Sequence, residues 1–203
     1  MIYKIIATGS KGNAVLINGT VLVDCGVPFK KLEDVYKDLK LVIITHEHQD
    51  HCNFATIKRL SKERPTLRFG CCDFLNLDVD NQDTYQMGKI YDYSDFTVEA
   101  IELVHDVPNC GYKLNFDGKT AIYITDTGNV DNIEAKNYDL YLIEANYDEE
   151  EIERRIREKE ESGEYVYEHR VKKTHLSKQQ ADEFLLMNMG KNSEFEYLHE
   201  HKE

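Results

Sequence analysis

The sequence predicts one mixed α/β domain, and three observations support that prediction. Short runs of β-branched and other apolar residues recur along the chain, as is typical of buried strands. Stretches with helical spacing lie between several of these runs. The 203 residues, 41% of them hydrophobic, suffice for one well-buried domain but not for two of ordinary size. We therefore predict a single domain over residues 1–190 and a polar, flexible tail over residues 191–203.

In the first half of the chain, apolar runs separated by turn residues predict strands, and one helix is stopped by Pro65. Asn18-Gly19 is typical of a hairpin turn. Residues 66–95 give only short strand-like pieces. The elements predicted here are strands over 2–7, 14–17, 21–23 and 41–44 and helices over 32–39 and 54–63.

In the second half, Asp117-Gly118 predicts another hairpin turn. Ser177 with Gln180 three residues later forms a helix-start signature, and Gly190 predicts the end of that helix. Glutamates precede arginines at helical spacing after Glu149. The elements predicted here are strands over 96–103, 111–116, 120–125 and 139–143 and helices over 149–161 and 178–189.

Side chains able to bind a metal follow the predicted strands. Thr45-His46-Glu47-His48-Gln49-Asp50-His51 comes directly after a buried strand, too dense a pattern for an incidental polar turn. Imidazole and carboxylate together suit zinc, or manganese and iron where oxygen dominates. Since several strand ends can supply one site, we predict a metal centre. The other residues in such positions are Asp24, His105, Asp126, Glu144 and, before a helix, His175.

Composition excludes several classes of protein. The net charge of −13 disfavours loose coating of a polyanion, although divalent ions would offset it locally. Five cysteines without a Cys-x-x-Cys pair indicate neither a disulfide framework nor a zinc ribbon. No apolar run has membrane-spanning length, and the first residues read as a strand without a signal-peptide cleavage pattern. We therefore expect a cytoplasmic protein with no membrane partner.

Candidate substrate contacts are less specific. The glycine-punctuated turn holding Ser10 and Asn13 could present amides to an anion, and Asn146 and Ser177 could contact phosphate. Ser177 is explained equally well as a helix cap. His199-x-His201 is expected to be incidental. Basic residues are concentrated in one part of the sequence, which comprises Arg154, Arg155, Arg157, Arg170, Lys172 and Lys173. We expect this basic concentration either to flank a substrate channel or to pair with acidic residues on the surface.

The order His46-x-His48-x-Asp50-His51, His105, Asp126 and His175 resembles the ligand set of the metallo-β-lactamase superfamily, with Asp24 at its first acidic motif. Within that superfamily the chain is similar to the YycJ/WalJ type, an RNase Z-like group of phosphodiesterases and exonucleases. The motifs that carry this likeness are Gly9-Ser10-Lys11-Gly12-Asn13, Thr125-Asp126-Thr127-Gly128, Glu144-Ala145-Asn146 and His175-Leu176-Ser177.

The resemblance implies a four-layer αββα sandwich that holds two divalent ions, zinc or manganese. His46, His48 and His105 would hold one ion; Asp50, His51 and His175 would hold the other, with Asp126 bridging them. The group often has histidine where this chain has Tyr147. The chain has no room for the large insertion of the RNase J-type nucleases.

The implied activity is a metal-dependent phosphodiesterase, most closely a DNA exonuclease-like nuclease, that uses hydroxide activated by two metals. Asp50 would assist the hydroxide, Asp24 would orient a ligand, and Glu144, Asp148 or His169 would protonate the leaving group. The substrate would be DNA, RNA or a nucleotide. Alternatives are hydrolysis of small phosphodiesters such as cyclic nucleotides, a glyoxalase II-type thioesterase, and a binding module with a structural metal. A homodimer is left open.

Overall fold

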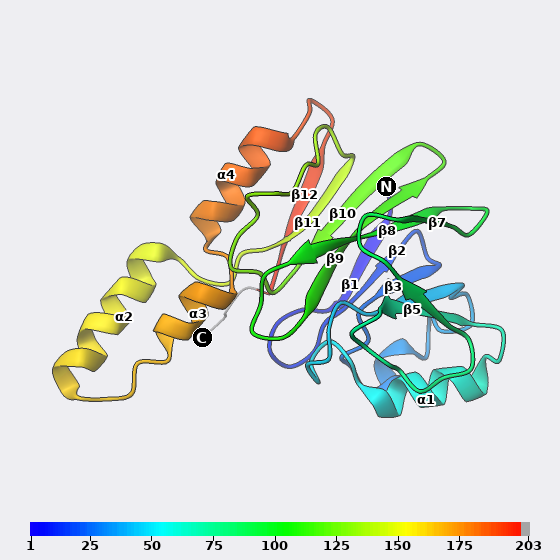
Figure 1. Cartoon of the computed structure of the whole chain (residues 1–203), viewed down its shortest axis with the longest axis horizontal. Coiled ribbons are helices and arrows are strands. Elements are labelled where there is room, and N and C mark those ends of the chain that lie inside the picture. The colour runs from blue at the N-terminus through cyan, green and yellow to red at the C-terminus, as the bar shows by residue number, and fades with distance from the viewer. Residues whose placement is uncertain (200–203) are drawn as a thin grey trace. The chain divides into compact units, whose positions relative to one another are not determined.

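The computed structural model describes residues 1–199, and the chain divides into two compact units, residues 1–100 and 101–203 (Figure 1). Each unit has its own cluster of buried apolar side chains. The single domain expected over residues 1–190 stays a prediction. Four residues of the expected tail, 200–203, and with them His201, lie outside the described residues.

The first unit holds a six-stranded sheet whose strand order equals chain order. Strands β1 to β3 pair in antiparallel fashion, and β3 to β6 pair in parallel. The strands are β1 (Tyr3–Ala7), β2 (Ala14–Ile17), β3 (Val21–Val23), β4 (Leu41–Ile43), β5 (Arg68–Cys72) and β6 (Gln82–Tyr85).

Helix α1 (Phe54–Glu63) connects β4 to β5. Asn53 caps it by accepting the Thr56 N–H at 3.1 Å, and the helix ends just before Pro65, as predicted. Ile57 and Leu60 join the apolar core of the first unit. The helix expected over 32–39 is wrong: a 3₁₀ turn, η1 (Phe29–Leu32), leads into turns where two successive N–H groups share the Leu32 carbonyl.

The second sheet has the strand order β12-β11-β10-β9-β8-β7, and β8 runs across the boundary between the units. Strands β10, β11 and β12 pair in parallel, whereas β9 and β10 form an antiparallel hairpin. The strands are β7 (Ile90–Asp92), β8 (Thr97–Leu103), β9 (Asn109–Phe116), β10 (Lys119–Ile124), β11 (Leu140–Glu144) and β12 (Glu194–Leu198).

Three helices complete the second unit: α2 (Glu149–Ser162), α3 (Glu168–Thr174) and α4 (Lys178–Asn188). Figure 1 shows α2 and α3 as neighbours and α4 beside β11. Helix α4 begins with the predicted capping box of Ser177 and Gln180, and it buries Phe184 and Leu185 in the core of this unit. Strand β12 lies within the segment expected to be a flexible tail, so that expectation is wrong for residues 194–198.

Two aspartates that follow strands adopt a left-handed backbone. Asp24 after β3 has φ 60°, and Asp126 after β10 has φ 53°. Aspartate tolerates this conformation better than most residues because its short side chain can bond to nearby groups. Each turn therefore redirects the chain at the strand end and presents a carboxylate there.

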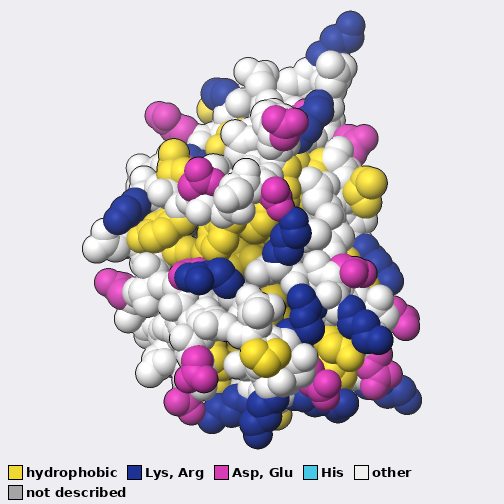
Figure 2. Space-filling model, turned by 90° about the vertical axis from the view of Figure 1, so that its right-hand side faces the viewer, with side chains coloured by type: hydrophobic (Ala, Val, Ile, Leu, Met, Phe, Trp, Pro, Cys, Tyr) yellow, Lys and Arg dark blue, Asp and Glu magenta, His cyan; other side chains and the backbone are white. Residues whose placement is uncertain are grey.

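The surface mixes charges of both signs. On the face drawn in Figure 2, acidic and basic side chains are interspersed, with apolar patches between them. Among residues 1–199, no helix has both the length and the apolar character needed to cross a membrane.

Candidate metal centre

Residues 45–51 of the first unit are organised by Asp24. Its carboxylate is fully buried, and Oδ1 accepts hydrogen bonds from the backbone N–H and the hydroxyl of Thr45, both at 2.9 Å. Oδ2 lies 2.7 Å from Nδ1 of His51. A carboxylate bound to one ring nitrogen fixes the orientation of an imidazole and directs the other nitrogen outward. Asp24 therefore lies where it can orient the His51 ring.

Three histidines gather on this loop. The His46 ring centroid lies 4.3 Å from that of His51 and 4.7 Å from that of His48. Nδ1 of His46 lies 3.0 Å from the Thr45 hydroxyl. His46 and His51 are fully buried, whereas His48 and Asp50 are half-buried. The loop thus gathers neighbouring imidazoles and a carboxylate, with the Asp50 Oδ2 atom 3.7 Å from Nε2 of His51.

Asn13 holds this loop from the turn after β1. Its backbone N–H donates to the Asp50 carbonyl at 2.6 Å, and its side-chain amide donates to the same carbonyl at 3.2 Å. The amide nitrogen also lies 2.8 Å from Nε2 of His51. Asn13 is 2% exposed, so its contacts support the loop. Ser10 of the same turn is exposed.

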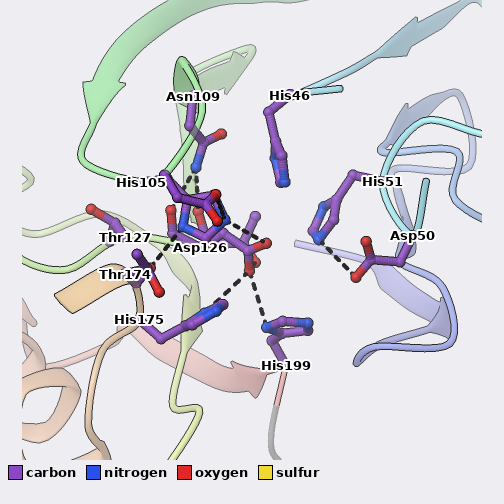
Figure 3. A network of polar contacts seen from close by, with 12 residues as sticks. His46, Asp50, His51, His105, Asn109, Asp126, Thr127, Thr174, His175 and His199 are labelled. Carbon is purple, nitrogen blue, oxygen red and sulfur yellow. Dashed lines mark hydrogen bonds and ion pairs between the residues drawn. The ribbon is translucent and has the colours of Figure 1, made fainter. Parts of the chain in front are cut away.

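In the second unit, four side chains bring potential metal-ligand atoms within 4.8 Å of one another: Asp126, Glu144, His175 and His199. Figure 3 shows the two imidazoles directed at the Asp126 carboxylate. Asp126 Oδ1 lies 3.0 Å from Nδ1 of His199 and 3.8 Å from Nδ1 of His175. These residues come from the ends of β10, β11 and β12 and from the turn between α3 and α4. The predicted strand-end pattern therefore produces a real cluster within this unit.

Glu144 is the centre of that cluster. It is fully buried, with Oε1 2.5 Å from Nδ1 of His175 and 3.1 Å from Nδ1 of His199. Oε2 accepts the backbone N–H groups of Thr127 and Leu176 at 3.1 and 3.2 Å. Both oxygens are therefore engaged in positioning neighbouring groups.

The same contacts shift the pKa values of Glu144 and His175. Burial favours a raised pKa for Glu144, but hydrogen bonds from His175 and His199 outweigh it and lower the pKa below its ordinary value. Burial favours a lowered pKa for His175, but its hydrogen bond to Glu144 raises the pKa. Glu144 is thus held as a carboxylate, which argues against the expected role as proton donor to a leaving group.

His105 lies beside this cluster. Its Nδ1 is 2.8 Å from the Thr174 carbonyl, and its Nε2 is 3.8 Å from Asp126 Oδ2 and 3.1 Å from Asp106 Oδ1. Asn109 donates from its amide to the carbonyls of Thr125 and Asp126 at 3.0 and 2.7 Å, which fixes the turn. His105 and its neighbours are drawn together in Figure 3.

His199 was expected to be incidental, and the structure shows otherwise. It is 7% exposed and contacts both Asp126 and Glu144. The signal that could have found it is the alternation of glutamates with Phe195 and Tyr197, which is typical of a strand. His199 directly follows β12, and His46 lies shortly after the end of β4.

The remaining predicted substrate and proton-donor residues have structural partners. The Ser177 hydroxyl accepts the Gln180 N–H at 3.0 Å and donates to Glu149 at 2.7 Å, so its cap role is confirmed. Asn146 donates its amide to the His199 carbonyl at 3.2 Å. Asp148 caps α2 by accepting two backbone N–H groups. His169 is exposed, 3.6 Å from Glu160.

The basic concentration is largely neutralised by acids. Arg154 and Arg155 both pair with Glu151, Lys172 pairs with Glu153, and Arg170 pairs with Asp106. These contacts favour the interpretation as paired surface charges over a basic substrate channel.

Comparison with known proteins identifies the family of this chain. A model of the beta-lactamase superfamily domain matches residues 20–189. An exodeoxyribonuclease WalJ of Streptococcus pneumoniae is 29% identical over 97% of this chain and 80% of its own length.

Two solved structures confirm the predicted metallo-β-lactamase fold class. The metallo-beta-lactamase fold protein YhfI of Bacillus subtilis superposes with a TM-score of 0.74 at 16% identity, over 99% of this chain and 86% of that one. The short form of human tRNase Z superposes with a TM-score of 0.68 at 17% identity, over 98% and 92%. Because the family model covers most of the chain, this protein belongs to the beta-lactamase superfamily and has the metallo-β-lactamase fold.

Proposed function

We propose that this protein is a metal-dependent nuclease that hydrolyses phosphodiester bonds in DNA from a strand end. The observation that carries the proposal is the cluster of Asp126, His175 and His199 around the buried Glu144. The likeness to an exodeoxyribonuclease over nearly the whole chain supports the same substrate class.

The cluster fits a divalent metal ion by its chemistry. It offers imidazole nitrogen and carboxylate oxygen, the donors that zinc and manganese accept. Asp126, His175 and His199 would hold an ion in the second unit, and His105 would contribute beside Asp126. His46, His48, Asp50 and His51 would supply the ligands of a second ion in the first unit. A bound divalent ion supplies Lewis acidity and makes water a nucleophile at neutral pH.

The chain's own residues prepare that chemistry. Glu144 holds Nδ1 of His175, which leaves Nε2 as the ring nitrogen available to a ligand. In the first unit, Asp24 holds Nδ1 of His51, and the side-chain amide of Asn13 lies 2.8 Å from Nε2 of the same ring. Both orienting carboxylates are fully buried, so solvent does not compete for them.

One variant pair tests the proposal. Asparagine has the size of aspartate and also tolerates the left-handed backbone of residue 126. Asp126→Asn therefore keeps the turn but removes a carboxylate oxygen from the cluster. We expect its nuclease activity to fall by more than about a hundredfold, beyond the usual effect of losing an outer partner of a ligand. Asp117→Asn is the matched control, since Asp117 also has a left-handed backbone (φ 50°) but lies in an exposed hairpin. Full activity in Asp126→Asn would refute the metal mechanism.

A substrate panel tests the specificity. Protein loaded with manganese or zinc is offered end-labelled single- and double-stranded DNA, RNA, cyclic mononucleotides and a glutathione thioester. We expect stepwise shortening of DNA. Cleavage of cyclic nucleotides alone would favour the small-phosphodiester alternative, with which the net charge of −13 is compatible. Cleavage of the thioester alone would refute phosphodiester chemistry.

A further inference from the structure

A cavity of about 290 Å³ lies in the second unit next to the histidine cluster. Its walls come from the segment after β11, from α2 and α3 and from the start of α4. The volume is near the lower end of small-ligand pockets, about 300 Å³, and suits one nucleoside-sized group.

One wall of the cavity holds a buried carboxylate with spare hydrogen-bonding capacity. Glu168 is 2% exposed, and its Oε1 accepts from Lys159 Nζ at 2.6 Å. Its Oε2 has no hydrogen-bond partner within residues 1–199. A buried acceptor without a donor is costly, so this atom indicates that a donor arrives from a ligand or from water.

The charge of the cavity indicates which part of a nucleotide it accepts. Its lining carries two basic residues, Arg155 and Lys178, against three acidic ones, Asp148, Glu151 and Glu168, which sum to −1. Arg155 is already paired with Glu151, Nε to Oε1 at 2.9 Å. Such a lining disfavours a phosphate group and favours a neutral group that carries N–H donors.

The other walls suit a flat ring. Ile152 and Val171 supply apolar surface, and Tyr147 and Tyr167 supply aromatic surface on which a base can stack. Tyr167 is fixed partly by Lys159, whose Nζ lies 4.0 Å from the ring centroid. The same lysine therefore holds both the carboxylate and an aromatic wall of the cavity.

The cavity is joined to the metal-ligand cluster by Asn146. This residue lines the cavity and donates its amide to the backbone carbonyl of His199. Ala145, also in the lining, directly follows Glu144.

We propose that this cavity is a nucleobase subsite, which receives the base of the nucleotide next to the phosphate that is cleaved and prefers guanine. Guanine presents two adjacent donors, N1–H and the 2-amino group, and the two lone pairs of Glu168 Oε2 can accept both, whereas thymine presents a single N–H. The proposal rests on the proposed nuclease function, for which it names the part of the substrate that this unit recognises.

The test measures binding of deoxyguanosine and thymidine to the zinc-loaded full chain by calorimetry. Neither nucleoside has a phosphate, so neither can compete at the metal through one. We expect deoxyguanosine to bind at least about tenfold more tightly than thymidine, the usual effect of a hydrogen bond to a charged group. Glu168→Gln should remove most of that preference.

Glu153→Gln is the matched control, because Glu153, like Glu168, pairs with a lysine across α2 and α3 but lies outside the cavity lining. Tyr167→Ala provides a second variant should Glu168→Gln fail to fold. Tyr167 is 41% exposed, and its loss should weaken binding of both nucleosides about fivefold or more through lost stacking.

Equal affinity for the two nucleosides, or wild-type affinities in both cavity variants, would overturn the subsite. This failure is distinct from failure of the proposed function. Cleavage of DNA without nucleoside preference would refute the subsite alone. Preferential binding of deoxyguanosine, lost in Glu168→Gln, without DNA cleavage would refute the nuclease and leave the subsite standing.

Discussion

The Oε1 atom of Glu144 lies 2.5 Å from Nδ1 of His175, and the same oxygen lies 3.1 Å from Nδ1 of His199. One buried carboxylate therefore orients two imidazoles, one before α4 in the chain and the other after it. This relationship explains how Glu144, at the end of β11, can fix the orientation of both rings.

Replacing Glu144 by glutamine should weaken metal binding. The variant exchanges one acceptor oxygen for an N–H₂ group facing backbone and imidazole donors, so the two rings lose their fixed orientation. We expect zinc affinity to fall by about 10- to 100-fold, as is usual for an outer partner of a ligand histidine. Competition with a chromophoric chelator measures it. Glu160→Gln is the control, since Glu160 faces His169 on the surface at 3.6 Å; equal zinc affinities in the two variants would contradict the role given to Glu144.

Gly26→Ala should disrupt the loop of residues 45–51, which carries His46, His48 and His51. A Cβ atom at Gly26 would lie 1.7 Å from the carbonyl oxygen of Asp50 and 2.6 Å from the backbone nitrogen of His51. Because both neighbours are backbone, the loop itself must move, and we expect a loss of at least about 1–3 kcal/mol in the free energy of unfolding. Urea denaturation measures it.

Gly19→Ala is the control for that variant. A Cβ atom at Gly19 would meet no other atom within 4 Å, and the cost of the substitution arises from the left-handed backbone (φ 71°) alone, about 1 kcal/mol. Zinc affinity should be unchanged in Gly19→Ala and reduced in Gly26→Ala. A Gly26→Ala protein with wild-type stability and zinc affinity would show that the loop accommodates the added methyl group.

The cysteines should be unreactive in the native protein. All five are buried and free of disulfides, and burial raises the pKa of Cys71 to about 12. A thiol with that pKa is protonated at neutral pH, and the thiolate is the reactive form. We expect Ellman's reagent to label no cysteine rapidly in the native state and five after denaturation. Rapid labelling of one equivalent at neutral pH would show that a thiol is accessible.

Stability should depend on pH through the pair of Lys159 and Glu168. Burial favours a raised pKa for Glu168, but the hydrogen bond from Lys159 outweighs it, and the pKa lies below the ordinary 4.5. A lowered carboxyl pKa contributes stability above the unfolded-state value, and that contribution is lost as pH falls through the folded-state value. Glu168→Gln should therefore lose about 1.5–3 kcal/mol at pH 7, the usual worth of a charged hydrogen bond, and much less at acidic pH below both values.

Thermal or urea unfolding at several pH values measures this difference. Glu153→Gln should change stability little at any pH, because its pair with Lys172 is exposed to solvent. A stability difference between wild type and Glu168→Gln that stays constant down to strongly acidic pH would contradict the assigned charge state.

Local patterns in the sequence identified the elements whose side chains carry strong periodicity. The strands around Leu22, Val42 and Ile122 and the helix capped by Asn53 were all predicted, because apolar runs and caps act over a few neighbouring residues. Strand β6, with the sequence Gln-Asp-Thr-Tyr, was not predicted. It is largely polar and forms a strand through parallel pairing with β5, which is distant in sequence.

The sequence by itself determined the family, the sheet-forming segments and the dense histidine loop with its orienting acid, because these depend on residue type and short-range spacing. Only the tertiary structure decided that Glu144 is an orienting carboxylate and that His199 joins Asp126 and His175. The position of His199 depends on the parallel pairing of β12 with β11, which brings residue 199 beside a strand end more than fifty positions earlier. Hydrogen bonds from His175 and His199 outweigh the effect of burial on Glu144 and lower its pKa, so it is held as a carboxylate.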